Sequence, residues 1–128
     1  INIIEDCQKN ICARINPALM IQALSNLLGN AVKYSEPDTI VNVSVKEVEQ
    51  EIKIFVTDQG HGISSQHLER LFERFYRVDT ARSRKMGGTG LGLSIVKHIA
   101  QVHGGQVTVE SKLGQGSTFI IHLPRLLT

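Results

Sequence analysis

Two amides and one amine, side chains that can bind a metal ion or phosphate, stand at helical spacing in the first third of the chain. Asn26, Asn30 and Lys33 stand at i, i+4 and i+7, so a helix places them on one side. Asparagine is a mediocre helix former because its amide competes with the backbone, so two of them one turn apart require a reason. A solvated helix face explains this pattern as well as a ligand site does. The choice depends on the rest of the chain.

Glycine-bearing segments follow this helix at three places, namely residues 58–62 (DQGHG), 88–92 (GTGLG) and 114–116 (GQG). Short glycine spacings recur in many loops, so none of the three is specific alone. The second precedes a predicted helix, whose free N-terminal amides and positive dipole end suit a phosphate chain. Together with the polar helix, the three segments indicate a site for a magnesium–nucleotide complex. The P-loop pattern and a complete G-x-G-x-x-G are absent, which argues against P-loop and dinucleotide folds.

The length of 128 residues predicts one domain, covering residues 1–128. Fourteen basic and twelve acidic residues give a net charge of +2, too small to indicate nucleic-acid or membrane binding. Six of the fourteen cations nevertheless lie within sixteen residues, and beside the glycine segments this basic stretch suits a polyanion. They are Arg70, Arg74, Arg77, Arg82, Arg84 and Lys85.

The two cysteines and the hydropathy favour a cytoplasmic setting. Cys7 and Cys12 have no metal-binding spacing and do not indicate a secreted disulfide scaffold. No apolar run approaches the roughly 20 residues of a membrane span, and no signal segment opens the chain. Because the chain starts without methionine, we expect a fragment of a larger protein.

The first half predicts a strand at residues 1–4, a possible short strand at residues 11–15 and a long helix. Asn16 and Pro17 are a typical cap and first residue for that helix, which should end near Tyr34. Its expected buried stripe faces away from the three polar residues. This stripe is Ile21, Leu24, Leu28, Ala31 and Val32.

Two strands with period two follow. Residues 41–45 and 52–56 alternate apolar and polar side chains, which predicts half-buried antiparallel strands joined at 48–50. The same alternation places Asp58 on the apolar side of the second strand. A carboxylate there is costly unless something donates to it.

The second half predicts a short amphipathic helix through Leu68, Leu71, Phe72 and Phe75, capped by Ser64 or Ser65. The polar, basic stretch up to residue 88 has the composition of a lid or binding loop. A helix at 91–103 should end at Gly104-Gly105, and strands at 107–111 and 118–123 complete the fold. This order predicts an α/β (α+β) two-layer sandwich, with helices on one face of a mixed sheet.

These motifs resemble the boxes of sensor histidine kinases over nearly the whole chain, from about residue 14 to residue 124. The matching segments are 26–34 (NLLGNAVKY), 58–62 (DQGHG), 71–77 (LFERFYR), 88–94 (GTGLGLS) and 114–117 (GQGS). They are similar to the N, first glycine, F, second glycine and third glycine boxes. The resemblance implies the catalytic, ATP-binding domain, with the Bergerat fold of the Hsp90, gyrase B and MutL ATPases. In that fold a mostly antiparallel sheet of about five strands carries three helices on one face.

The resemblance also implies a role for each matched position. Asn30 would coordinate Mg²⁺ through its amide oxygen, as suits a hard cation that keeps several waters. Asn26 would support the metal or the phosphates, and Lys33 would offer a charge to the phosphates. Asp58 would accept a hydrogen bond from the adenine amine, which favours ATP over GTP.

The remaining implied nucleotide contacts surround these residues. Gly60 and Gly62 would let the chain pass close to the base, and Arg77 and Arg82 would meet the terminal phosphate. The other implied contacts are Tyr34, Ile63, Gly88, Thr89, Gly90, Leu91, Gly92, Leu93, Ser117 and Thr118.

Catalysis is expected from Asn26, Lys33 and Arg77 by positioning and charge neutralisation. The hydrolysing relatives in the resemblance carry a glutamate where this chain has Asn26, so ATP hydrolysis should be poor. The resemblance implies phosphoryl transfer to a histidine of a separate dimerisation domain, then to a response-regulator receiver domain. The implied parent is a homodimer anchored in the inner membrane, with no direct membrane or nucleic-acid contact by this domain.

The five histidines of this chain lack the His-Glu-x-x-x-Pro setting of the phosphoacceptor, so we expect surface or capping histidines. They are His61, His67, His98, His103 and His122. Two other functions fit the motifs: a nucleotide-responsive module that docks without transfer, and an anti-sigma-type serine kinase. The segment at residues 72–77 argues against the serine kinase. Phe72 is expected to be buried, while Phe75 either packs or anchors the lid.

Overall fold

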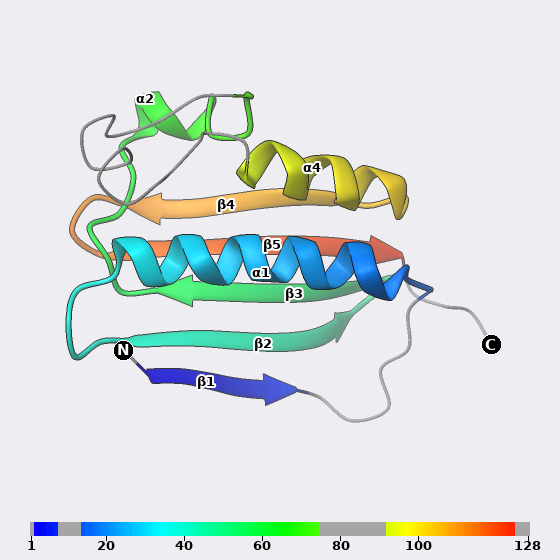
Figure 1. The fold of residues 1–128 in the computed structure, drawn as a ribbon, viewed down its shortest axis with the longest axis horizontal. Helices are drawn as coiled ribbons and strands as arrows, with labels where there is room; N and C mark the ends of the chain where they lie inside the picture. Colours follow the sequence, from blue (N-terminus) through cyan, green and yellow to red (C-terminus); the bar gives the residue numbers. More distant parts are fainter. Residues whose placement is uncertain (1, 8–13, 75–91, 125–128) are drawn as a thin grey trace.

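The structure, a computed structural model, describes residues 2–7, 14–74 and 92–124 (Figure 1). Its elements follow one another along the chain, with the strands interleaved between helices. They are β1 (Asn2–Cys7), α1 (Pro17–Tyr34), β2 (Ile40–Val48), β3 (Glu51–Asp58), α2 (Ser65–Leu68), α4 (Gly92–Val102), β4 (Gln106–Lys112) and β5 (Gly116–Pro124).

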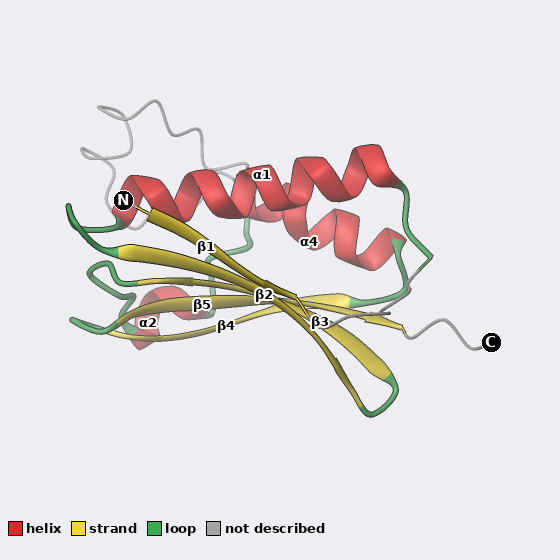
Figure 2. Ribbon diagram, turned by 90° about the horizontal axis from the view of Figure 1, so that it is seen from below, coloured by secondary structure: helices red, strands yellow, loops and turns green. Residues whose placement is uncertain are grey.

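The sheet has five strands in the order β1-β2-β3-β5-β4. β1 runs parallel to β2, whereas every other neighbouring pair is antiparallel. Both long helices, α1 and α4, lie on the same face of this sheet (Figure 2). The predicted two-layer sandwich with a mixed, mostly antiparallel sheet is therefore confirmed.

The third predicted helix is shorter than expected. α2 is a single turn of four residues that lies beside the β4 edge of the sheet (Figure 1). Leu71 is buried and Phe72 packs edge-to-face on Phe119, with ring centroids 6.2 Å apart, but both lie in turns after the helix. Ser64 takes the cap position without a side-chain capping bond. Phe75 lies outside the described residues.

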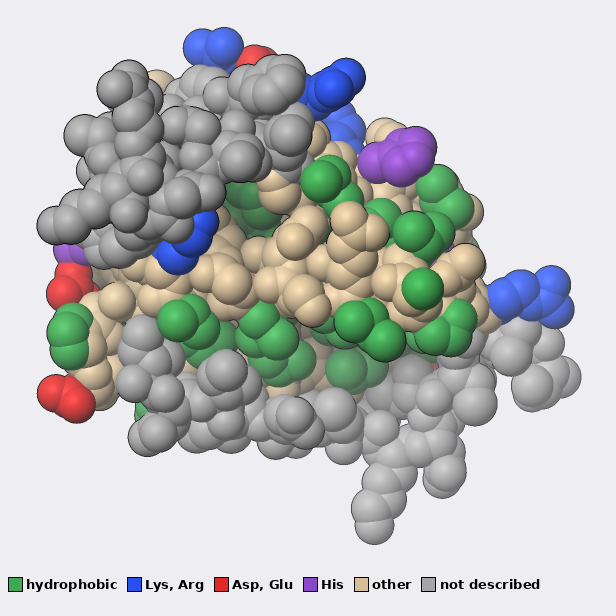
Figure 3. Space-filling model, viewed as in Figure 1, with side chains coloured by type: hydrophobic (Ala, Val, Ile, Leu, Met, Phe, Trp, Pro, Cys, Tyr) green, Lys and Arg blue, Asp and Glu red, His purple; other side chains and the backbone are tan. Residues whose placement is uncertain are grey.

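The bounds of α1 agree with the prediction, because Asn16 Oδ1 accepts a hydrogen bond from Leu19 N–H and Pro17 opens the helix. The buried stripe differs from the predicted one. Ile21 is 64% exposed and Val32 is 40% exposed, and apolar side chains remain visible on this face (Figure 3). Of the predicted stripe, Ala31 is buried and Leu24 and Leu28 are half-buried against the core, and the other buried residues of this helix are Met20, Ala23 and Leu27. Since α1 is apolar around much of its circumference, sequence periodicity alone does not select the buried side.

The alternation predicted for β2 and β3 is present. Val41, Ile52, Ile54 and Val56 are buried on the side that faces the helices, and Asp58 continues that side at 6% exposure. A hairpin turn at residues 49–50 joins the two strands. β5 pairs with the edge of β3 that lies away from β2, and its buried side chains belong to the same core.

Two further predictions concern the possible strand at residues 11–15 and the end of the second long helix. Residues 14–16 have no strand conformation, and residues 11–13 of the possible second strand lie outside the described ranges. α4 ends as predicted, because Gly104 has a φ of +76° and Gly105 N–H donates to Ala100 O at 2.9 Å.

Candidate functional site

A row of polar side chains lies at one end of the helix-facing side of the sheet. Asp58 of β3 pairs with Ser117 of β5, which in turn pairs with Ser111 of β4. The preceding row of the same face is Val56, Phe119 and Val109, all part of the apolar core or packed against it. The apolar face therefore ends in one carboxylate and two hydroxyls.

Asp58 has two backbone donors. Its Oδ1 accepts hydrogen bonds from Gly60 N–H at 2.9 Å and Ser117 N–H at 3.2 Å. Burial raises the pKa of the Asp58 carboxyl above its usual 3.8, while these two hydrogen bonds lower it. Within the described ranges no donor contacts Oδ2. This second oxygen can therefore accept a hydrogen bond from a ligand amine.

The glycines after Asp58 allow close contacts between backbone segments. A Cβ on Gly60 would lie 2.2 Å from Tyr34 O, and Gly60 forms a β-bridge with Ser35 at the end of α1. A Cβ on Gly62 would lie 1.9 Å from Lys112 O. Both glycines were expected to let the chain approach a base. The structure shows that each is required for close approach to neighbouring protein backbone, and the approach to a base stays a prediction.

One polar residue of α1, Asn26, contacts the start of α4. Asn26 Nδ2 donates to Gly92 O at 3.3 Å, which connects α1 to the first residue of α4. Asn26 thus faces a neighbouring helix, and its Oδ1 is the amide atom not used in this bond. Asn30, Lys33 and Tyr34 follow on the same helix and are half-buried. Of the second glycine segment only Gly92 lies within the described residues, and it is this residue that Asn26 contacts.

Three other residues predicted to contact the nucleotide lie in separate parts of the fold. Ile63 lies in the loop after β3, where its N–H donates to Ser111 Oγ at 2.8 Å. Leu93 is half-buried and packs against the core. Thr118 follows Ser117 in β5, so its side chain points to the opposite face, where Oγ1 bonds with Thr57 Oγ1 at 3.1 Å. The structure does not bring the Thr118 side chain together with Asp58.

Six predicted contacts lie outside the described residues, namely Arg77, Arg82, Gly88, Thr89, Gly90 and Leu91. In the part of the chain that is described, no group of three His, Cys, Asp or Glu residues could hold a metal ion. The predicted ligand Asn30 is an amide, which Mg²⁺ accepts alongside retained waters.

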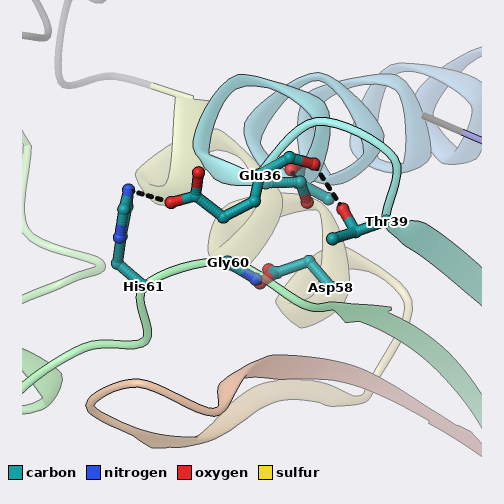
Figure 4. Close-up of polar contacts among 7 residues, drawn as sticks. Glu36, Thr39, Asp58, Gly60 and His61 are labelled. Atoms are coloured by element: carbon teal, nitrogen blue, oxygen red, sulfur yellow. Dashed lines mark hydrogen bonds and ion pairs between the residues drawn. The ribbon is translucent and has the colours of Figure 1, made fainter.

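The contacts of Ser111 and Glu36 near Asp58 were not anticipated from the sequence. Ser111 Oγ bonds with Ile63 N, Gly116 O and Ser117 Oγ. Glu36, just after α1, forms an ion pair with His61 at 2.8 Å between Oε1 and Nε2 (Figure 4). The sequence did contain one indication for Ser111. It stands two residues after Val109 in an alternating strand, which places its side chain on the inward side.

Besides His61, the histidines His103 and His122 make structural contacts with other groups. His103 bridges the two long helices, because Nε2 accepts from Asn16 N–H at 3.0 Å and Nδ1 lies 2.7 Å from Ile99 O. His122 contacts Thr108 Oγ1 at 2.8 Å and Glu51 Oε2 at 3.3 Å. The contact of His103 with the last turn of α4 agrees with the expected capping role, whereas His122 is half-buried within β5 and is neither a surface nor a capping histidine. No helix among the described residues is long and apolar enough to cross a membrane.

The two-layer sandwich, with its inward aspartate beside glycine loops, defines a class of ATP-binding domain. The family model described as "Histidine kinase-, DNA gyrase B-, and HSP90-like ATPase" matches residues 15–127, and the chain belongs to this family. The resemblance to sensor histidine kinases is thereby confirmed by comparison with known proteins.

Curated relatives of the chain are named as sensor kinases. The sensor-like histidine kinase SenX3 of Mycobacterium tuberculosis is 46% identical over 127 residues, covering 99% of this chain and 31% of SenX3. The sensor protein SrrB of Staphylococcus aureus is 47% identical over 106 residues, covering 83% of this chain and 18% of SrrB. The chain therefore spans about a third or less of these relatives.

Solved structures share the fold. The mycobacterial sensor histidine kinase MprB superposes with a TM-score of 0.84 at 32% identity, covering 98% of this chain and 86% of that one. Full-length ShkA in complex with AMPPNP gives a TM-score of 0.84 at 28% identity, covering 99% of this chain and 26% of ShkA.

Proposed function

We propose that this domain binds Mg-ATP and transfers the γ-phosphate to a histidine on the dimerisation domain of its parent sensor kinase. From there the phosphoryl group would pass to an aspartate of a response-regulator receiver domain. The names of SenX3, SrrB and MprB support this assignment. The parent would be a membrane-anchored homodimer, with this domain on the cytoplasmic side.

The observation that carries the proposal is the environment of Asp58. A buried carboxylate with two backbone donors on Oδ1 and none in the described residues on Oδ2 is suited to accept from an exocyclic amine. Adenine presents an amine at this position, whereas guanine presents a carbonyl. ATP should therefore bind in preference to GTP.

The residues of α1 fit the other end of the nucleotide. Asn30 would hold Mg²⁺ through its amide oxygen, and Lys33 would neutralise phosphate charge. Asn26 uses Nδ2 to bind Gly92 O, which leaves Oδ1 for the metal or its waters. Bound Mg²⁺ would neutralise charge on the phosphates. Ser117 and Tyr34 would line the base end, while Gly92 and Leu93 would lie near the phosphates, with residues 88–91, Arg77 and Arg82.

Transfer is favoured over hydrolysis by the residue at position 26. An amide cannot act as a general base to activate water, so we expect slow ATP hydrolysis. A histidine imidazole is already a nucleophile, and phosphoryl transfer depends mainly on positioning and charge neutralisation.

The test mixes the domain with γ-labelled ATP, Mg²⁺ and the histidine-bearing dimerisation domain of its parent. We expect acid-labile, alkali-stable label on the dimerisation domain, and none on this domain alone. Asn30→Asp or Asp58→Ala should abolish labelling while leaving the circular-dichroism spectrum unchanged. Labelling at the wild-type rate in either variant would contradict that residue's role. ATP binding without any transfer would favour the docking module instead.

A further inference from the structure

We propose that Ser111 is a positioning residue for purine recognition, acting on Asp58 through Ser117. This inference rests on the nucleotide site proposed above. Ser111 lies in β4, two strands away from Asp58, on the same face of the sheet. Ser111 Oγ bonds with Ser117 Oγ, and the backbone N–H of the same Ser117 donates to Asp58 Oδ1.

The Ser111 hydroxyl bonds with three groups that belong to two other segments. Its Oγ accepts from Ile63 N–H at 2.8 Å, lies 2.8 Å from Gly116 O and lies 2.7 Å from Ser117 Oγ. Ile63 belongs to the loop after β3, and the other two partners open β5. A single side chain thus holds that loop and the β5 start against β4.

The number of donors and acceptors decides how these contacts are arranged. A serine hydroxyl has one proton to donate and two lone pairs. Gly116 O can only accept, so the Ser111 proton must point to it for that contact to form. Ile63 N–H occupies one lone pair, and the other is left for Ser117. All three contacts exist together only if the Ser117 hydroxyl donates to Ser111.

This arrangement sets the polarity of the site. With its proton directed at Ser111, Ser117 Oγ presents only lone pairs to any other group. Its neighbour Asp58 likewise presents an acceptor, Oδ2. Two acceptors favour a purine with an amino group at position 6 over one with a carbonyl there. Ser111 would therefore contribute to base selection without contacting the base.

The same bonds also hold the donors of Asp58 in place. Gly60 N–H comes from the loop that contains Ile63, and Ser117 N–H comes from the β5 start. Those are the two segments that the Ser111 hydroxyl ties together. Removing that hydroxyl should loosen both donors and allow the carboxylate to rotate.

The experiment measures dissociation constants of the wild-type domain for ATP and for ITP, which carries a carbonyl in place of the 6-amino group. We expect Ser111→Ala to lower the ATP-over-ITP preference about tenfold, the size of effect typical of a lost buried hydrogen bond. The loss should fall mainly on ATP. Ser111→Thr keeps the hydroxyl and should retain most of the preference.

Thr108→Ala serves as the matched control. It removes a hydroxyl from the same strand, but Thr108 lies on the opposite face and bonds with His122. It should keep the wild-type preference. If the alanine variant at position 111 does not fold, Ser111→Cys preserves the side-chain size while weakening the hydrogen bonds and should reduce the preference in the same direction.

Equal losses of ATP and ITP affinity in a folded Ser111 variant would overturn the proposal, because a purely structural serine would affect both nucleotides alike. An unchanged preference would also overturn it. A wild-type domain that binds ATP no better than ITP would instead contradict the role of Asp58. A wild-type domain that binds neither nucleotide would contradict the proposed function itself.

Discussion

Asp58 combines a structural cost with its proposed role in recognition. Two backbone N–H groups stabilise its anion, but burial is the larger effect and raises the pKa of the carboxyl. A buried carboxylate that lacks a full set of donors is unfavourable for folding. Retaining it at the end of an apolar face is consistent with a ligand that supplies the missing donor.

The first prediction concerns stability against pH. Since the folded state has the higher pKa, it binds more protons than the unfolded chain between pH 3.8 and that raised value. The free energy of unfolding contributed by Asp58 therefore falls as pH rises through this window. Asp58→Asn removes the titration, so its stability relative to wild type should rise across the window and then stay constant. Urea denaturation from acid to neutral pH measures this difference, and parallel curves would contradict it.

The same substitution should weaken ATP binding. An asparagine retains an acceptor for the backbone donors but places an amide where the second oxygen stood. A lost hydrogen bond to a charged group is worth about 1.5–3 kcal/mol, which corresponds to a loss of roughly tenfold to hundredfold. Calorimetric titration at neutral pH measures it. An affinity equal to that of wild type would exclude Asp58 from base recognition.

At the scale of elements, the end of α1 is fastened to the loop after β3. Ser35 Oγ donates to Ala31 O at 2.7 Å, and Ser35 pairs with Gly60 in an isolated bridge. The ion pair between Glu36 and His61 lies next to this bridge (Figure 4). These contacts fix the predicted base-binding loop relative to the helix that carries the predicted metal ligand.

Two glycine substitutions compare a glycine packed against neighbouring backbone with one that has open space around it. In Gly60→Ala the new methyl group would meet Tyr34 O at 2.2 Å, so we expect a loss of about 1–3 kcal/mol in the free energy of unfolding. Gly29 lies exposed in α1, and a methyl group added there would meet nothing within 4 Å, so Gly29→Ala should raise stability by about 0.5–1 kcal/mol. Thermal unfolding of both variants measures the contrast. Equal effects would show that Gly60 is not tightly packed.

At the scale of the whole molecule, one apolar core joins the layers. Buried residues from both long helices and from β2, β3 and β5 form a single cluster, to which Leu71 after α2 also belongs. Helix and sheet layers therefore cannot lose their packing independently. We expect the domain to unfold as one cooperative unit.

Leu27→Ala tests this connection between the layers. Leu27 is fully buried on the sheet-facing side of α1, so its truncation should cost about 2–5 kcal/mol. Leu113→Ala is the control, because Leu113 is 68% exposed and its truncation should change stability by less than about 0.5 kcal/mol. Fluorescence and circular dichroism should report the same midpoint for each variant. Separate midpoints would contradict a single cooperative unit.

Local patterns were sufficient for most of the fold. The cap at Asn16, the period-two alternation of β2 and β3, and the glycines after α4 predicted elements that the structure contains. The buried side of α1 was predicted wrongly at Ile21 and Val32. Apolar residues surround much of that helix, so its rotation is decided by the sheet it packs on.

The sequence by itself determined which groups are available and how each is directed within its own element. Period two turns Asp58 inward, and the helical period places Asn26, Asn30 and Lys33 together. Only the tertiary structure decided which groups meet. Asp58 and Ser117 are far apart in the chain, and their pairing depends on the register between β3 and β5. That register places Ser117 beside Asp58, and alternation along β5 then turns Thr118 to the other face. The register is set by packing between the strands, so no local repeat in the sequence reveals it.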